Sequence, residues 1–119
     1  MIKLIKSKKK VKKMEEIKKL TNDKLKEITA DGRTVLLFSA TWCPDCRFLD
    51  PFLPEIEKDF SAAKFYKIDR DDSIDIAKEL NIFGIPSFVV YQDGEEIGRL
   101  VNKDRKTKEE VENFLNSLN

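Results

Sequence analysis

The chain has 119 residues, enough for one compact domain and too few for two. Hydrophobic residues make up 40% of it and include eight Phe, which excludes an intrinsically disordered chain. Lys and Arg number 23 against 22 Asp and Glu, and this net charge of +1 predicts no specific nucleic-acid partner. The absence of His excludes Cys-His and Ser-His catalysis and His-ligated metals.

The charge is unevenly distributed along the chain. Residues 1–13 contain seven Lys and no acidic residue, a charge of +7 that leaves −6 for residues 14–119. We therefore divide the chain into a basic N-terminal extension, residues 1–13, and a folded domain, residues 14–119. Two readings of the extension stay open, contact with an anionic partner and a solvated tail.

Cys43 and Cys46 are the only two cysteines. They are too few for the disulfide framework of a small secreted domain. No apolar run reaches the ~18 residues of a membrane span, and no signal-peptide stretch follows the basic start, so we expect a cytoplasmic protein without a transmembrane segment. A zinc site needs further Cys or His ligands, so we expect no metal, with zinc shared at a subunit interface as the alternative.

The first predicted elements are short. An apolar alternation that ends at Ile17 and Leu20 indicates a weak strand. Residues 21–23 offer N-cap chemistry for a short helix that ends near Ala30. Residues 35–38 are continuously apolar, which is typical of a strand buried on both faces.

The middle of the chain predicts a long helix. Apolar residues recur at helical spacing over residues 43–59. Pro44 suits the first turn of this helix, whereas Pro51 lies inside it and should produce a kink. Residues 64–69 then indicate a strand, and residues 76–80 a short helix.

The last elements predict a hairpin and a helix. Residues 87–91 and 95–101 read as strands that pair antiparallel across the Asp93-Gly94 turn. Thr107 and Glu110 have capping-box spacing at the start of a C-terminal amphipathic helix. Strands that alternate with helices and end in a hairpin predict an α/β fold, with a mixed sheet covered by helices on both faces.

The two cysteines lie at the start of a predicted helix that directly follows a buried strand. Active sites often lie at this carboxyl end of a strand. The helix N-terminus should stabilise a thiolate at Cys43. Cys46 lies one turn later, close enough to bond to Cys43, and we expect it to be more buried and less reactive. This arrangement predicts thiol–disulfide exchange in which Cys43 attacks and Cys46 resolves, the alternative being an incidental spacing.

Together these features resemble the thioredoxin family over roughly residues 16–118. The matching residues are Ala40-Thr41-Trp42-Cys43-x-x-Cys46 between strand and helix, Pro51, Gly84-Ile85-Pro86, and Asp93-Gly94. The resemblance implies a thioredoxin fold with a mixed central sheet of about five strands. It also implies a disulfide reductase without a cofactor other than the redox-active Cys43–Cys46 disulfide. Pro86 would be a cis proline that faces this disulfide, and the Ile85 backbone would pair with an extended substrate.

Within the family, the Trp42-Cys43-Pro44-Asp45-Cys46 segment looks like that of thioredoxin-related proteins with this WCPDC site. The resemblance implies that disulfide-containing proteins or small disulfides are substrates, and that a thioredoxin reductase or a thiol reductant supplies electrons. Trp42 either lines the substrate groove or packs over the helix start. Asp45 either opposes the helix dipole near the thiols or caps the first turn.

Leu37 departs from the family pattern, which places a buried Asp six residues before the first cysteine. That carboxylate helps to deprotonate the second cysteine, so we expect slow resolution by Cys46 here and acceleration by Leu37→Asp. Water, Asp45 or the leaving thiolate would take the proton. Two other functions stay open, an oxidase or isomerase and a redox-inactive binding module.

Overall fold

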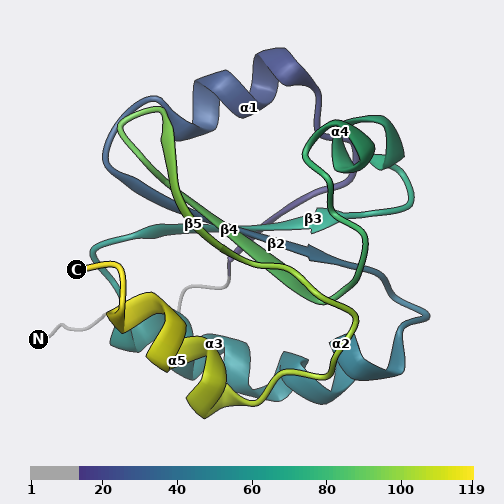
Figure 1. Ribbon diagram of the computed structural model, residues 1–119, viewed down its shortest axis with the longest axis vertical. Coiled ribbons are helices and arrows are strands. Elements are labelled where there is room, and N and C mark those ends of the chain that lie inside the picture. The colour runs from purple at the N-terminus through teal and green to yellow at the C-terminus, as the bar shows by residue number, and fades with distance from the viewer. Residues whose placement is uncertain (1–13) are drawn as a thin grey trace, which may run out of the picture.

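The computed structural model describes residues 14–119, so the basic extension predicted for residues 1–13 lies outside the described part. A five-stranded mixed sheet in the order β1-β3-β2-β4-β5 forms its centre (Figure 1). The strands are β1 (Glu15–Ile17), β2 (Arg33–Ser39), β3 (Lys64–Asp69), β4 (Ser87–Gln92) and β5 (Glu95–Leu100). β1, β3 and β2 are parallel, whereas β4 and β5 add antiparallel pairs. The predicted α/β fold class is confirmed.

Helices cover both faces of this sheet (Figure 1). α1 (Asn22–Thr29) and α4 (Ile74–Glu79) lie on one face. α2 (Pro44–Leu49), α3 (Leu53–Asp59) and α5 (Lys108–Asn116) lie on the other. Within residues 14–119, no helix is long and apolar enough to cross a membrane.

The continuous apolar run of β2 is explained by burial on both faces. Leu36 and Phe38 join one hydrophobic cluster, and Val35 and Leu37 join a second cluster with residues of α2, α3 and α5. Successive side chains of a strand point to opposite faces, so a strand between two helix layers must be apolar at every position. β2 is therefore the buried central strand of the sheet, and the chain passes from its carboxyl end into α2.

The helix predicted over residues 43–59 is divided into two. A 3-10 turn, η2 (Asp50–Phe52), separates α2 from α3, and it contains Pro51. Proline has no N–H to donate and its ring crowds the preceding turn, so the α-helical ladder is interrupted. In place of the predicted kink within one helix, the chain forms two α-helices joined by this 3-10 turn.

Local turn and capping signals match the structure. The Thr107 hydroxyl accepts a hydrogen bond from the Glu110 N–H at 3.1 Å and begins α5. Asp93 and Gly94 have φ angles of 51° and 91°, which suit the tight turn between β4 and β5. These signals are local because the Thr107 side chain bonds to its own helix and the Asp93-Gly94 pair readily adopts positive φ angles.

Candidate active site

Cys43 is the N-cap of α2, directly after the segment that leaves β2. Its sulfur accepts a hydrogen bond from the Cys46 N–H at 3.1 Å, and Pro44 occupies the first turn, where no N–H is required. The first N–H groups of a helix lack intrahelical partners, and here one of them points at the Cys43 sulfur. The predicted position of both cysteines at the helix start agrees with the structure.

Both cysteines carry free thiols, and both are buried, with 4% of Cys43 and 2% of Cys46 exposed. Burial alone therefore separates them less than expected. Burial and a hydrogen bond to the Cys43 side chain raise the pKa of Cys46 to about 11, while the Ser39 side chain and the Ala40 backbone act in the opposite direction. Cys46 is thus a thiol at neutral pH.

Leu37 lies in the cluster between the sheet and α2, α3 and α5, and only 2% of it is exposed. The buried polar and charged side chains of residues 14–119 are Thr29, Thr34, Ser39, Ser73, Ser87 and Lys106. None of these is a carboxylate, so the described core offers no buried acid to accept the Cys46 proton. Of this set, Ser39 lowers the pKa of Cys46 through its side chain, and a charge on Cys46 raises the pKa of Lys106.

Trp42 is exposed, with 56% of its surface accessible. Its indole N–H donates a hydrogen bond to Asp71 at 2.6 Å, and the Arg70 guanidinium lies 5.9 Å from the ring centre. The hydrogen bond from Trp42 holds the pKa of Asp71 below its usual range, with Arg70 adding to this effect. Sequence reasoning missed Asp71, although its position just after a parallel strand, at the edge that holds Cys43, could have indicated it.

Asp45 forms an ion pair with Arg105, whose Nε lies 2.9 Å from the carboxylate. The Arg105 guanidinium also lies 4.4 Å from the centre of the Phe48 ring. Of the two roles considered for Asp45, neither included this partner, because 60 positions separate the two residues. The contact fastens the β5–α5 connection to the first turn of α2.

The Ile85–Pro86 peptide bond is cis, as the resemblance implied. Ile85 belongs to the same hydrophobic cluster as Cys43 and Cys46, and Pro86 is buried at the start of β4. The backbone of Asn102 lies so close to Gly84 that a Cβ there would overlap it. The segment before β4 and the segment after β5 therefore pack directly against each other next to Ile85.

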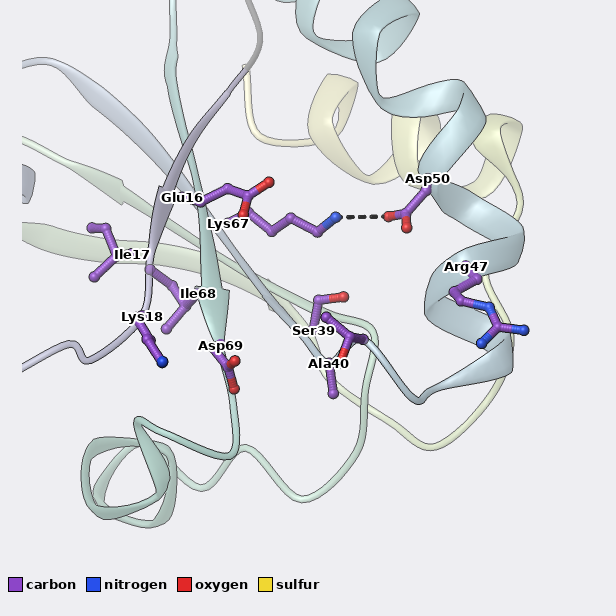
Figure 2. Close-up of a pocket in the computed structure, with 11 residues that line it drawn as sticks. Glu16, Ile17, Lys18, Ser39, Ala40, Arg47, Asp50, Lys67, Ile68 and Asp69 are labelled. Carbon is purple, nitrogen blue, oxygen red and sulfur yellow. Dashed lines mark hydrogen bonds and ion pairs between the residues drawn. The ribbon is translucent and has the colours of Figure 1, made fainter.

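A pocket of about 600 Å³ opens between the ends of β1, β3 and β2 and the first turns of α2 (Figure 2). Ser39 and Ala40 line it, and the Lys67–Asp50 ion pair of 2.9 Å crosses one side. Ser39 therefore connects the pocket with Cys46. Within the described chain, no three His, Cys, Asp or Glu side chains are placed to hold a metal ion.

The family profile described as thioredoxin matches residues 16–117. The chain belongs to the thioredoxin family. It is 36% identical to the H-type thioredoxin of Fagopyrum esculentum over 81 residues, which cover 67% of this chain and 70% of that protein. It is also 36% identical over 80 residues to mitochondrial thioredoxin-2 of Schizosaccharomyces pombe, covering 67% of this chain and 60% of that protein.

The oxidised structure of mitochondrial thioredoxin 3 from Saccharomyces cerevisiae has the same fold. It superposes with a TM-score of 0.73 at 28% identity and covers 87% of this chain and 94% of that protein. The family match, the fold and the closely spaced cysteine pair all support the same type of chemistry. The chain is a thiol–disulfide oxidoreductase of the thioredoxin family.

Proposed function

We propose that this thioredoxin-family protein reduces disulfides of proteins or small thiols through Cys43 and Cys46. The observation that carries the proposal is the hydrogen bond from the Cys46 N–H to the Cys43 sulfur at 3.1 Å. This contact holds the Cys43 sulfur at the first turn of α2, one turn from Cys46, and a cysteine thiolate is the nucleophile in disulfide exchange. Cys46 lies one helical turn later and is positioned to attack the Cys43 sulfur in the second exchange.

The reaction would proceed in two exchanges. The Cys43 thiolate attacks one sulfur of the substrate disulfide, a mixed disulfide forms, and the other substrate sulfur leaves as a thiolate. Cys46 then loses its proton to solvent and attacks the Cys43 sulfur. The Cys43–Cys46 bond forms, the mixed disulfide breaks, and the second substrate sulfur leaves with its electron pair. The substrate gains two electrons and the protein becomes oxidised.

Substrates would bind over the surface that joins Trp42 to the Ile85–Pro86 segment. Trp42 and Phe83 are large apolar side chains with 56% and 63% of their surfaces exposed. Exposed aromatic surface beside a reactive sulfur favours an extended peptide or another apolar disulfide. In this arrangement Asp45 and Pro44 shape the rim, and Asp71 keeps Trp42 in place.

Electrons would come from a thioredoxin reductase or a thiol reductant, and the protein would work in the cytoplasm. A reducing compartment keeps a closely spaced cysteine pair available for catalysis. Because one relative is a mitochondrial thioredoxin, cell fractionation should compare the cytoplasm with mitochondria. Recovery of the protein only from mitochondria would contradict the cytoplasmic assignment.

The test of the proposed function is reduction of insulin and of cystine, with Cys43→Ser and Cys46→Ser as variants. We expect Cys43→Ser to abolish turnover and Cys46→Ser to accumulate the mixed disulfide. A reduction potential of about −250 mV for the Cys43–Cys46 pair would agree with a reductase, and one of about −120 mV would indicate an oxidase instead. Undiminished turnover by Cys43→Ser would overturn the proposal.

A further inference from the structure

Lys106 is completely buried, with 0% of its surface exposed, in the connection between β5 and α5. Its ammonium lies 3.0 Å from the Asn102 carbonyl, 2.7 Å from Asn102 Oδ1 and 2.7 Å from the Asp104 carbonyl. Three acceptors require three N–H donors, which an ammonium has and a neutral amine lacks. The geometry therefore keeps Lys106 charged, so it cannot act as a base.

No carboxylate among the described residues lies within ion-pair distance of Lys106. Its three hydrogen bonds go to neutral oxygens, and a charge without a counter-ion is costly to bury. Burial lowers the pKa of Lys106, while the nearby charges of Glu110, Asp104, Cys46 and Asp45 raise it. Burial outweighs these charges, and Glu110 and Asp104 act on Lys106 more strongly than Cys46 does. Asp45 is paired with Arg105, and a Cys46 thiolate would be a further anion for this ammonium.

Contacts on either side hold the loop that carries Lys106 against the active site. Arg105, its neighbour in sequence, is bound to Asp45, the neighbour of Cys46. On the other side, the Asn102 backbone packs directly against Gly84, two residues before Pro86. Figure 1 shows the β5–α5 connection passing between the start of β4 and α2.

We propose that Lys106 is a positioning residue for the second exchange, in which its buried charge stabilises the developing Cys46 thiolate where the fold provides no buried carboxylate. This inference rests on the proposed function of the cysteine pair. The proton of Cys46 still goes to solvent, and Lys106 acts only through its field.

The size of the effect follows from thiol chemistry. A rise of one unit in the pKa of Cys46 lowers its thiolate fraction about tenfold but makes the thiolate about 3-fold more nucleophilic. The second exchange would therefore slow about 3-fold per unit. Removal of one nearby buried charge should cost about one to two units, so we expect a slowing of about 3- to 10-fold.

The experiment follows both exchanges in the full chain with dithiobis-nitrobenzoate, which releases one coloured thiolate on attack by Cys43 and another on attack by Cys46. Lys106→Gln removes the charge, and Lys103→Gln removes an exposed charge from the same loop as its control. Asn102→Asp keeps the shape and the hydrogen bond but supplies Lys106 with a counter-ion. Asn116→Asp, an exposed site on α5, makes the same chemical change elsewhere.

We expect Lys106→Gln and Asn102→Asp to slow the second release and to displace its pH profile upward, with the first release little changed and both controls like the parent. If Lys106→Gln fails to fold, Asn102→Asp decides the question. A folded variant with an unchanged second release and pH profile would overturn the role of Lys106. Absence of both releases in the parent protein would instead overturn the proposed function.

Discussion

At the scale of single residues, Ser39 is placed to assist Cys46. Its side chain lowers the pKa of the Cys46 thiol, and it lines the pocket beside α2. We predict that Ser39→Ala raises this pKa by about one unit, the equivalent of one hydrogen bond to a charged group, and slows resolution about 3-fold. The second release of nitrothiobenzoate measures this rate, and exposed Ser61→Ala is the control. Equal rates for Ser39→Ala and the parent would exclude the contribution.

Cys46 should also make the stability of the reduced protein depend on pH. Folding raises its pKa from the ordinary 9.0 to about 11, so the folded protein holds this proton more tightly than the unfolded chain does. That stability, about 2–3 kcal/mol, is present below about pH 9 and is lost as pH rises to about 11. Tyr66 and Tyr91 have raised pKa values and act in the same direction.

Comparison with Cys46→Ser isolates the contribution of the thiol. Urea unfolding of the two reduced proteins at several pH values should show a steeper alkaline loss of the free energy of unfolding in the parent. The tyrosine contributions cancel in this comparison because both proteins contain them. Parallel curves from about pH 9 to about pH 11 would contradict the raised pKa of Cys46.

At the scale of elements, the start of α5 holds the loop of Lys106 in position. The Thr107 hydroxyl caps the helix by accepting the Glu110 N–H at 3.1 Å. We predict that Thr107→Ala lowers the free energy of unfolding by about 1 kcal/mol, whereas Thr107→Ser retains most of the stability. Urea unfolding measures both, and an unchanged midpoint for Thr107→Ala would show that the cap is dispensable.

The close packing of the cis-proline segment against the β5–α5 connection gives a second prediction at this scale. A Cβ on Gly84 would overlap the Asn102 carbonyl, which belongs to the backbone, so Gly84→Ala should cost about 1–3 kcal/mol and slow disulfide reduction. A Cβ on Gly98 meets only the end of the Leu118 side chain, at 2.6 Å, so Gly98→Ala should cost less. Unfolding curves in which Gly98→Ala is the more damaging change would refute this packing.

At the scale of the whole molecule, residues 14–119 contain both hydrophobic clusters and every residue of the candidate site. We predict that a chain of these residues alone folds and reduces insulin within about twofold of the full chain, because a domain with its own core can fold alone. Its net charge would change from +1 to −6, so any salt-dependent binding to anionic vesicles should be lost. A truncated chain that fails to fold would contradict the predicted domain boundary.

The fold and the cysteine pair could be predicted because their signals are local. The apolar run of β2, the cap at Thr107 and the Asp93-Gly94 turn each lie within a few residues of the structure they specify. The break at Pro51 was predicted only as a kink, since its effect depends on how far the following helix can continue. Asp71 and Arg105 could not be assigned to Trp42 and Asp45, because 29 and 60 positions separate the partners.

The sequence by itself therefore determined the alternation of strands and helices, the place of the cysteine pair at the start of a helix, and the absence of His. Spacing and composition carry this information directly, whereas the thioredoxin architecture and the buried acid expected where Leu37 stands came from the resemblance to that family. Only the tertiary structure decided what surrounds Cys46. It brings Ser39 to the Cys46 thiol, and it buries Lys106, with three neutral oxygen partners, in the loop that is tied to Asp45. A lysine in a polar loop reads as exposed in sequence, because its burial arises from contacts of that loop with α2 and the cis-proline segment.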